Sequence, residues 1–243
     1  VYEWYNVRTK NFPLFTNKSF FTDDSVLTCA TADSILNGKS YSAVYKEYYK
    51  LYPNRGYGGN FRIWAKSEDE KPYNSFGNGS AMRVSPVGFA YDSLEDVLAE
   101  AKRSAEVTHN HNEGVKGAQA TAACIYLAKK GESKEKIKEY IQSTFDYDLD
   151  DTVARLQNVN KFDETCQGSV PQSIICFLES TGFEDALRAA VSIGGDSDTI
   201  ACIAGGIAEA FYGGVPDHIK KEVLSRLDGR LLQIVADFRK KFF

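Results

Sequence analysis

Two short stretches of the chain bring carboxylates and hydroxyls together, each at the start of a run that is typical of a helix. The first is Thr22-Asp23-Asp24, and the second runs from Asp196 to Thr199 with the sequence DSDT. Each could simply cap a helix, because Asp and Thr accept hydrogen bonds from free backbone N–H groups at the positive end of the helix dipole. One Asp is enough for a cap, however, and adjacent carboxylates repel each other unless a cation is bound. The duplication therefore favours a cation site.

The candidate ligands all carry oxygen, with no His or Cys among them. They are Thr22, Asp23, Asp24, Asp196, Asp198 and Thr199. Such ligands favour Mg²⁺, Mn²⁺ or Ca²⁺ over Zn²⁺. An EF-hand is excluded, since position 12 counted from Asp196 is Ile207, where a bidentate Glu is required. Four carboxylates suit a two-metal centre that activates water, so this chemistry indicates either a two-metal hydrolase or a Ca²⁺-stabilised helical protein.

The composition is that of an ordinary globular protein: 43% of the 243 residues are hydrophobic and 26% are charged. No stretch approaches the roughly 18 unbroken apolar residues of a membrane helix, and the opening VYEWYNVRTKNF has no apolar secretory core. A net charge of −4 argues against a nucleic-acid partner. Five scattered cysteines without a C-x-x-C pair argue against disulfides and zinc and favour a reducing compartment. We expect a cytoplasmic monomer that does not enter a membrane.

The hydrophobic period is helical almost throughout. Helices are predicted over residues 93–107, 112–131, 133–145, 170–181, 183–195, 198–214, 216–229 and 230–242. Ser93 and Asp96 resemble a capping box, and Pro171 is placed at a first helical position. No run of alternating residues indicates a strand. The sequence therefore predicts an all-α fold, a single compact multi-helix domain over residues 1–243.

Two features of this helical chain point towards its centre and its site. In residues 198–214 a stripe of small side chains would let a neighbouring helix approach closely, which predicts a central helix; the stripe is Ala201, Ala204, Gly205 and Ala208. Residues 53–79 form the one long irregular stretch, rich in Gly, Asn and Tyr. A loop of that length inside a compact domain is usually functional.

Four motifs, taken in order between residues 21 and 213, resemble those of a known family. They are FTDDSVLT, FGNGSAMR, VTHNH and SIGGDSDTIACIAGGIAEAFYG. The chain is similar to the ADP-ribosylglycohydrolases, and most of all to the branch of the dinitrogenase reductase-activating glycohydrolase. This resemblance implies an all-α fold with a binuclear centre of two divalent cations, Mg²⁺ or Mn²⁺, held by the six oxygen ligands named above.

The resemblance also assigns roles to single residues. Glu3 matches an acid that lies near the metals, and Glu3, Asp24 and Asp198 are the expected catalytic acids. The glycine-rich segment RGYGGNF resembles a loop bordering the phosphates, and NSFGNGSAMR one that lines ADP-ribose. The implied substrate-binding residues are Gly58, Gly59, Ser75, Phe76, Gly77, Asn78 and His109. The residues alone leave other readings open, since the glycines could serve turns, His109 could be an interior histidine, and Phe76 could belong to the core.

Together these features predict a metal-dependent hydrolase that removes ADP-ribose from a modified protein side chain, with arginine favoured, or from a small ADP-ribosyl acceptor. The alternative is a non-catalytic relative, either structural like the lens J-crystallins or only an ADP-ribose-binding protein. The family usually opens with a helix that carries G-D-x-x-G before the acid. This sequence starts after that helix, so Glu3 would lie near the chain end.

Overall fold

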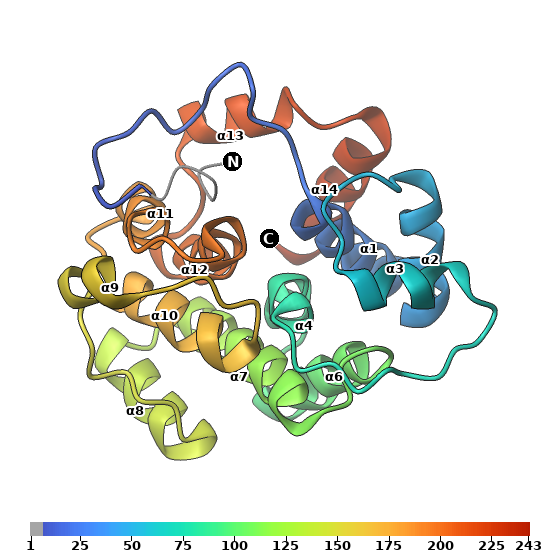
Figure 1. Ribbon diagram of the computed structural model, residues 1–243, viewed down its shortest axis with the longest axis horizontal. Helices are drawn as coiled ribbons and strands as arrows, with labels where there is room; N and C mark the ends of the chain where they lie inside the picture. Colours follow the sequence, from blue (N-terminus) through green and yellow to red (C-terminus); the bar gives the residue numbers. More distant parts are fainter. Residues whose placement is uncertain (1–6) are drawn as a thin grey trace.

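A computed structural model describes residues 7–243, and this part of the chain is built of helices connected by loops (Figure 1). No strand occurs within it; the one β-type contact is an isolated antiparallel bridge between Gly77 and Thr165. The predicted all-α class is confirmed. The helices are α1 (Asp23–Asn37), α2 (Tyr41–Leu51), α3 (Gly59–Lys66), α4 (Gly79–Met82), α5 (Ser85–Ala90), α6 (Leu94–Glu106), α7 (Asn112–Lys129), α8 (Lys134–Phe145), α9 (Val153–Val159), α10 (Cys166–Leu178), α11 (Phe183–Ser192), α12 (Ser197–Tyr212), α13 (Asp217–Leu224) and α14 (Gly229–Phe242).

Helix α12 lies in the middle of one half of the fold, as its small side chains predict. It packs against α7, α10 and α11, and all three are adjacent to it in Figure 1. A Cβ on Gly205 would stand 3.0 Å from Leu187 of α11, and one on Gly206 would stand 3.2 Å from Ser85 of α5. The two glycines cost helix propensity, about 1 kcal/mol each, and close packing of the neighbours offsets that cost.

The other half of the fold is organised around α1, which packs against α2, α5 and α14. Its core is unusually aromatic. Tyr45 and Tyr48 of α2 are fully buried, and Tyr57 and Phe61 stack with their ring centroids 5.4 Å apart. Helix α1 also contacts α12. The two helices that carry the acidic motifs therefore come from different halves and meet between them.

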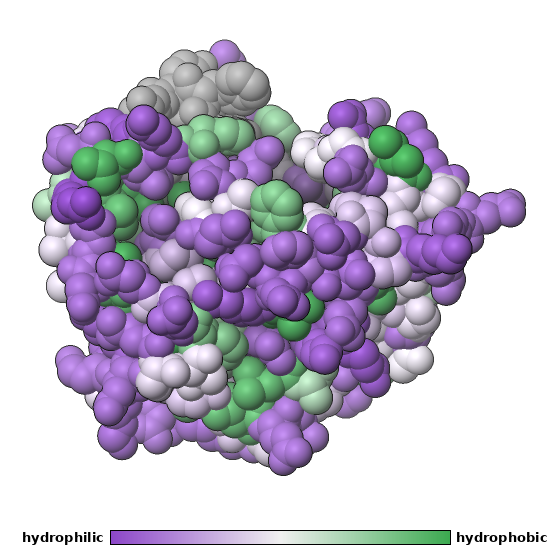
Figure 2. All heavy atoms as spheres, turned by 60° about the horizontal axis from the view of Figure 1, so that its bottom comes forward, coloured by the Kyte–Doolittle hydropathy of each residue, from purple (hydrophilic) through white to green (hydrophobic). Residues whose placement is uncertain are grey.

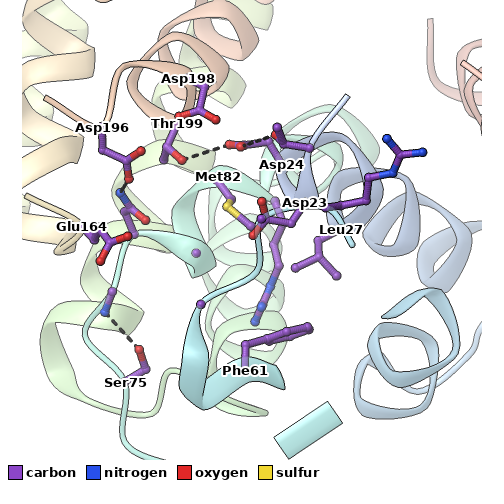
Figure 3. Close-up of a pocket in the computed structure, with 18 of the residues that line it drawn as sticks. Asp23, Asp24, Leu27, Phe61, Ser75, Met82, Glu164, Asp196, Asp198 and Thr199 are labelled. Carbon is purple, nitrogen blue, oxygen red and sulfur yellow. Dashed lines mark hydrogen bonds between the residues drawn. The ribbon is translucent and has the colours of Figure 1, made fainter. Parts of the chain in front are cut away.

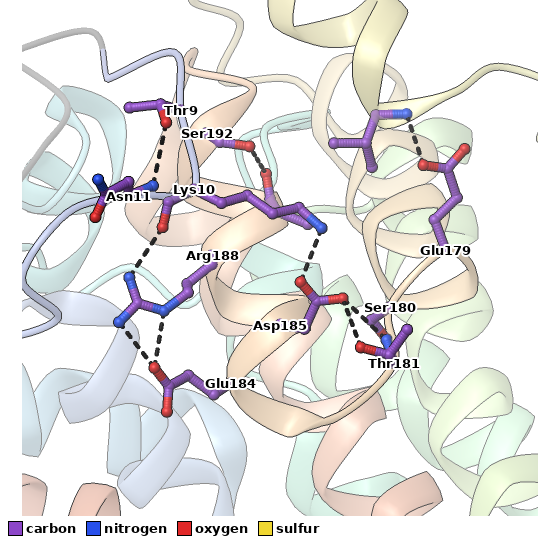
Figure 4. A network of polar contacts seen from close by, with 12 residues as sticks. Thr9, Lys10, Asn11, Glu179, Ser180, Thr181, Glu184, Asp185, Arg188 and Ser192 are labelled. Carbon is purple, nitrogen blue, oxygen red and sulfur yellow. Dashed lines mark hydrogen bonds and ion pairs between the residues drawn. The ribbon is translucent and has the colours of Figure 1, made fainter.

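Ion pairs and hydrogen bonds attach the first described segment to α11 (Figure 4). Lys10 forms an ion pair with Asp185 at 2.8 Å, while Arg188 donates to the carbonyl oxygens of Lys10 and Phe12. Arg188 also pairs with Glu184 one turn away, at 2.8 Å. These contacts fix the path of the chain before it enters α1.

Two local expectations are wrong. Pro171 lies inside α10 rather than at its first position, because the helix begins at Cys166, where the Thr165 hydroxyl accepts from the Gly168 N–H at 3.0 Å. The irregular stretch 53–79 contains a helix, α3. Its buried face consists of Phe61, Trp64 and Ala65, so tertiary packing against the aromatic core supplies the stability that so short a segment lacks alone.

The described surface is mostly polar. Figure 2 shows hydrophilic side chains over most of one face, with apolar ones in separate small areas. None of the helices in residues 7–243 is long and apolar enough to span a bilayer. All five cysteines are free thiols, and four of them are buried, in agreement with the prediction that they form no disulfide framework.

A Gly117→Ala exchange tests the close packing of α7 on α10. The new Cβ would lie 2.4 Å from the sulfur and 2.8 Å from the Cβ of Cys166, which leaves no room without movement of α10. We expect the free energy of unfolding in urea to fall by about 1–3 kcal/mol, the usual cost of overpacking. Gly229→Ala, where a Cβ meets nothing within 4 Å, is the control. Equal stability of the two variants would contradict the packing.

Candidate active site

The two acidic motifs, 172 residues apart in sequence, meet in one pocket of about 590 Å³, a size suited to a nucleotide-like ligand. Figure 3 shows Asp23 and Asp24 at the start of α1, facing Asp196, Asp198 and Thr199 at the start of α12. The pocket is lined by Phe20, Thr22, Asp23, Asp24, Leu27, Asn54, Arg55, Gly56, Gly58, Gly59, Asn60, Phe61, Tyr73, Ser75, Gly77, Asn78, Gly79, Met82, Arg83, His109, Glu164, Asp196, Asp198 and Thr199.

The side chains of these motifs bond to one another and to the pocket instead of capping their helices. Asp24 accepts from the hydroxyls of Thr22 at 2.9 Å and Thr199 at 3.2 Å, which joins the two helix starts. The side-chain amide of Asn78 donates to Asp196 at 2.6 Å. Neither N-cap residue, Thr22 or Asp196, makes a side-chain cap hydrogen bond.

Other helices of the same chain show what ordinary caps look like here. Ser93, Ser133, Thr152 and Asp228 each accept a hydrogen bond from a backbone N–H in the first turn of their helices. Side-chain capping is therefore available to this sequence, although Ser40 at the start of α2 also lacks it. The helix-cap explanation of the acidic motifs does not account for their geometry.

Burial and mutual repulsion make the acids of the site hard to ionise together. Burial, followed by the charges of Asp198 and Asp23, raises the pKa of Asp24 to about 8. Burial is also the main cause that raises the pKa of Asp196, and the nearby charge of Asp198 adds to it. Clustered carboxylates in a desolvated place favour either protons or a cation.

A glycine loop closes over the first motif. The backbone N–H of Asp23 donates to the carbonyl of Arg55 at 2.7 Å, and Gly56 follows with φ +97°. A Cβ at position 56 would stand 3.1 Å from the Asp23 carboxylate. Glycine is therefore needed both for the left-handed backbone and for the close approach. The loop continues through Gly58 and Gly59, which line the same pocket.

The opposite wall is formed by the segment around α4. A Cβ on Gly79 would lie 3.2 Å from Nε2 of His109, so this glycine keeps the pocket open beside the imidazole. Ser75 accepts from the N–H of Gly77 at 3.1 Å, and the Asn78 N–H donates to the carbonyl of Glu164 at 2.7 Å. His109 is 5% exposed, and burial chiefly, with the charge of Arg83, lowers its pKa well below 6.5. The imidazole is neutral.

The structure brings most of the predicted site residues together. The six predicted metal ligands line the pocket, and so do six of the predicted substrate-binding residues: Gly58, Gly59, Ser75, Gly77, Asn78 and His109. Phe76 is not among the lining residues; it is 47% exposed and its ring lies 5.3 Å from that of His111. Glu3 lies outside the described residues. The roles assigned to all these residues stay predictions.

Sequence reasoning missed several residues of the pocket. Arg83 is the last residue of the predicted NSFGNGSAMR segment and Tyr73 directly precedes it, so this closeness in sequence was the available signal. Glu164 had no local signal, because it stands in the loop before α10, far from either motif. It enters the pocket because the carbonyl of Phe76 accepts from the N–H of Cys166 at 2.9 Å, so that residues 76–78 and 164–166 lie side by side.

The site offers the type of ligand that a hard divalent cation prefers, because carboxylate and hydroxyl oxygens dominate it. Within residues 7–243, no cation is among the main causes that shift the pKa values of Asp23, Asp24 and Asp196. As the side chains stand, no three His, Cys, Asp or Glu groups within residues 7–243 converge closely enough to hold an ion. Asp24 and Asp196 are instead turned towards hydroxyl and amide donors. The two-metal centre stays a prediction.

Comparison with known proteins establishes the family. Residues 3–242 match the sequence profile of ADP-ribosylglycohydrolase. The ADP-ribosylhydrolase ARH3 of Mus musculus is 30% identical over 262 aligned residues, which cover 82% of this chain and 71% of the mouse protein. The ARH3 of Homo sapiens is 29% identical, over 82% of this chain and 72% of its own length. The chain belongs to the ADP-ribosylglycohydrolase family. It is accordingly a hydrolase of ADP-ribosyl bonds.

Two further comparisons concern the fold and a bacterial relative. The ADP-ribosylarginine hydrolase Tri1 of Pseudomonas putida is 29% identical over 170 residues, covering 66% of this chain and 46% of that protein. A solved structure described as an ADP-ribosylglycohydrolase-related protein complex superposes with a TM-score of 0.70 at 22% identity, over 98% of this chain and 93% of that one. The family predicted from four motifs is confirmed, whereas a place in the dinitrogenase reductase-activating branch stays a prediction.

The raised pKa values predict how stability depends on pH when a chelator is present. Below about pH 4, Asp24 is protonated in both states; between about 4 and 8 the folded protein keeps a proton that the unfolded chain releases. Stability in urea should therefore fall as pH rises from about 5 to about 8. The stability of the Asp24→Asn variant should fall less steeply over the same pH range. Adding Mg²⁺ or Mn²⁺ should reduce the pH dependence of the wild-type stability. Parallel declines of wild type and variant would contradict the prediction.

Proposed function

We propose that the protein is a metal-dependent hydrolase that releases ADP-ribose from a modified side chain or a small ADP-ribosyl compound. One observation carries the proposal: two acidic motifs from different halves of the fold face each other in a pocket, and neither caps its helix. An arrangement that leaves buried carboxylates close together is costly without a cation. A bound cation would make the same arrangement favourable.

The six oxygen ligands would hold two divalent cations, Mg²⁺ or Mn²⁺. When bound, these ions lower the pKa of a water molecule and position it for attack on the anomeric carbon of the ribose. The proposed ligands are Thr22, Asp23, Asp24, Asp196, Asp198 and Thr199. Asp24 or Asp198, or Glu3 outside the described residues, would accept the proton of that water. The attacking oxygen would bond to the anomeric carbon as the bond to the acceptor breaks; the electron pair would leave with the acceptor, which would receive the proton taken from the water.

The remaining walls suit the rest of ADP-ribose. Gly58 and Gly59 lack side chains and would let a diphosphate approach the backbone N–H groups of their loop. Ser75, Gly77 and Asn78 border the pocket on the opposite wall, beside the neutral imidazole of His109. A neutral histidine binds a sugar hydroxyl or base by hydrogen bonding without adding charge. Phe76 remains a candidate for stacking at the rim, because its ring is half exposed.

Arginine is the favoured acceptor. The support is the resemblance to the dinitrogenase branch, the similarity to a relative named as an ADP-ribosylarginine hydrolase, and the position of Glu164. Its exposed carboxylate lines the pocket and makes no ion pair within residues 7–243. Its charge is among those that raise the pKa of Asp23, after burial and the charges of Asp198 and Asp196. A guanidinium seated beside Glu164 would pair with that carboxylate.

Family membership and the retention of both acidic motifs favour this activity over a structural role like that of the J-crystallins. A protein that only binds ADP-ribose would need the loops but not the buried carboxylates. A cytoplasmic location, a monomeric state and the absence of a nucleic-acid partner stay predictions.

Asp198→Asn tests the metal-dependent reaction. Calorimetry with Mg²⁺ and Mn²⁺ should show binding to the wild type and clearly weaker binding to the variant. Release of ADP-ribose should fall by about 10² or more, in line with loss of a positioned acid or metal ligand. A chelator should lower the melting temperature of the wild type only, because a cation stabilises the state that binds it. Asp237→Asn, on α14 away from the pocket, is the matched control. Metal binding and turnover equal to wild type in Asp198→Asn would refute the site.

Glu164→Gln tests the acceptor. Release from ADP-ribosylarginine should fall by about 3- to 10-fold in kcat/KM, a modest loss because the carboxylate is exposed and screened by solvent. Release from an ADP-ribosylserine peptide should change by less than about twofold. Glu139→Gln, an equally exposed acid on α8, controls for net charge. The arginine preference is wrong if Glu164→Gln lowers kcat/KM by the same factor for both linkages, or if it changes kcat/KM for neither.

A further inference from the structure

A hydrogen-bonded chain leads from a buried cation to the imidazole on the pocket wall. Arg83 is fully buried; its Nη2 donates to the hydroxyl oxygen of Thr108 at 2.8 Å and to the carbonyl of Ser104 at 3.1 Å. Its guanidinium stacks on the ring of Tyr45, 4.1 Å from the centroid. The Thr108 hydroxyl, also fully buried, lies 2.7 Å from Nδ1 of His109.

Each link restricts the next. A guanidinium is always a donor and never an acceptor, so the Thr108 oxygen must accept from Arg83. The Thr108 oxygen keeps a second lone pair, so this bond alone leaves either Thr108 or Nδ1 of His109 as the donor between them. The positive charge of Arg83 selects the Thr108 hydroxyl as the donor, because it stands on the Nδ1 side of the ring and repels a proton there. In a neutral imidazole the proton is left on Nε2.

The nitrogen that receives the proton faces the ligand space. Nε2 lies 3.2 Å from the position a Cβ would take on Gly79 and 3.7 Å from that on Gly77. Both glycines line the pocket, and the missing side chains leave room in front of the ring. His109 therefore meets a ligand with an N–H donor rather than with a lone pair.

We propose that Thr108, oriented by Arg83, is a positioning residue that holds His109 as the Nε2–H tautomer, so that the imidazole donates a hydrogen bond to an oxygen of the bound ADP-ribosyl group. The identity of the ligand in this inference rests on the proposed function. The tautomer of His109 does not depend on it. It implies that the imidazole gives a hydrogen bond to the ligand, while the acids at the starts of α1 and α12 accept protons or bind cations.

The tautomer is measured directly by two-bond ¹⁵N–¹H correlation NMR on the ligand-free protein at about pH 7.5. The sequence has three histidines, and His111 and His218 serve as internal references. We expect the Nε2–H pattern for His109 in the wild type. The Nδ1–H pattern, or an averaged signal, would overturn the proposal whether or not the protein hydrolyses anything.

Thr108→Val removes the hydroxyl with little change in shape, and Thr108→Ser restores it. The Val variant should lose the single-tautomer pattern and bind ADP-ribose about 3- to 10-fold more weakly by calorimetry, the worth of one neutral hydrogen bond. The Ser variant should recover the single-tautomer pattern and the affinity for ADP-ribose. Thr121→Val, which removes a buried hydroxyl without a partner among residues 7–243, should leave both unchanged.

The NMR pattern and the affinity test the tautomer and the ligand contact separately. Weaker binding by Thr108→Val with an unchanged His109 pattern would mean that Thr108 acts only through packing and would overturn the relay. An unchanged affinity together with a changed pattern would overturn the hydrogen bond to the ligand. A wild type that shows the Nε2–H pattern but does not bind ADP-ribose would contradict the proposed function and with it the ligand contact, while the tautomer would stand.

Discussion

Repulsion between buried carboxylates at the starts of α1 and α12 is the constraint on which the rest of the structure depends. Asp24 is 6% exposed and Asp196 is 8% exposed, in a chain where several other helices use similar side chains as ordinary caps. Close like charges out of water raise the pKa of each group. The fold has to hold them together against this repulsion. It does so with donors, the hydroxyls of Thr22 and Thr199 and the amide of Asn78.

The architecture supplies the force that opposes the repulsion. The apolar packing of α12 against α7, α10 and α11, and the aromatic core beneath α1, fix the two helix starts independently of the acids. Hydrophobic burial over many residues outweighs a local electrostatic cost. Functional sites typically tolerate such a local electrostatic cost, because the packing of the surrounding fold holds their residues in place. A cation would then bind to carboxylates that are already assembled.

The wall opposite the acids has a different electrostatic character. It carries the buried Arg83 and the neutral His109. A ligand with both negative phosphates and hydroxyl-bearing sugars has parts that suit each wall. The pocket therefore places the hydrogen-bond donor His109 across from the clustered acids at the starts of α1 and α12. Glu164 adds a carboxylate beside residues 76–78, on the same wall as His109.

The sequence by itself determined the helical class, the central position of residues 198–214 and the identity of the acidic motifs. Hydrophobic period, small-residue spacing and local composition are properties of neighbouring residues. The sequence could not determine that Pro171 lies inside α10 or that residues 59–66 are helical. Both depend on packing against other parts of the fold.

Only the tertiary structure showed that Thr22 and Asp196 do not act as side-chain caps. The same holds for the placement of Glu164 beside residues 76–78 and for the contact of Arg83 with Thr108 and His109. Each of these depends on contacts between segments that are distant in the chain, and no local pattern encodes them.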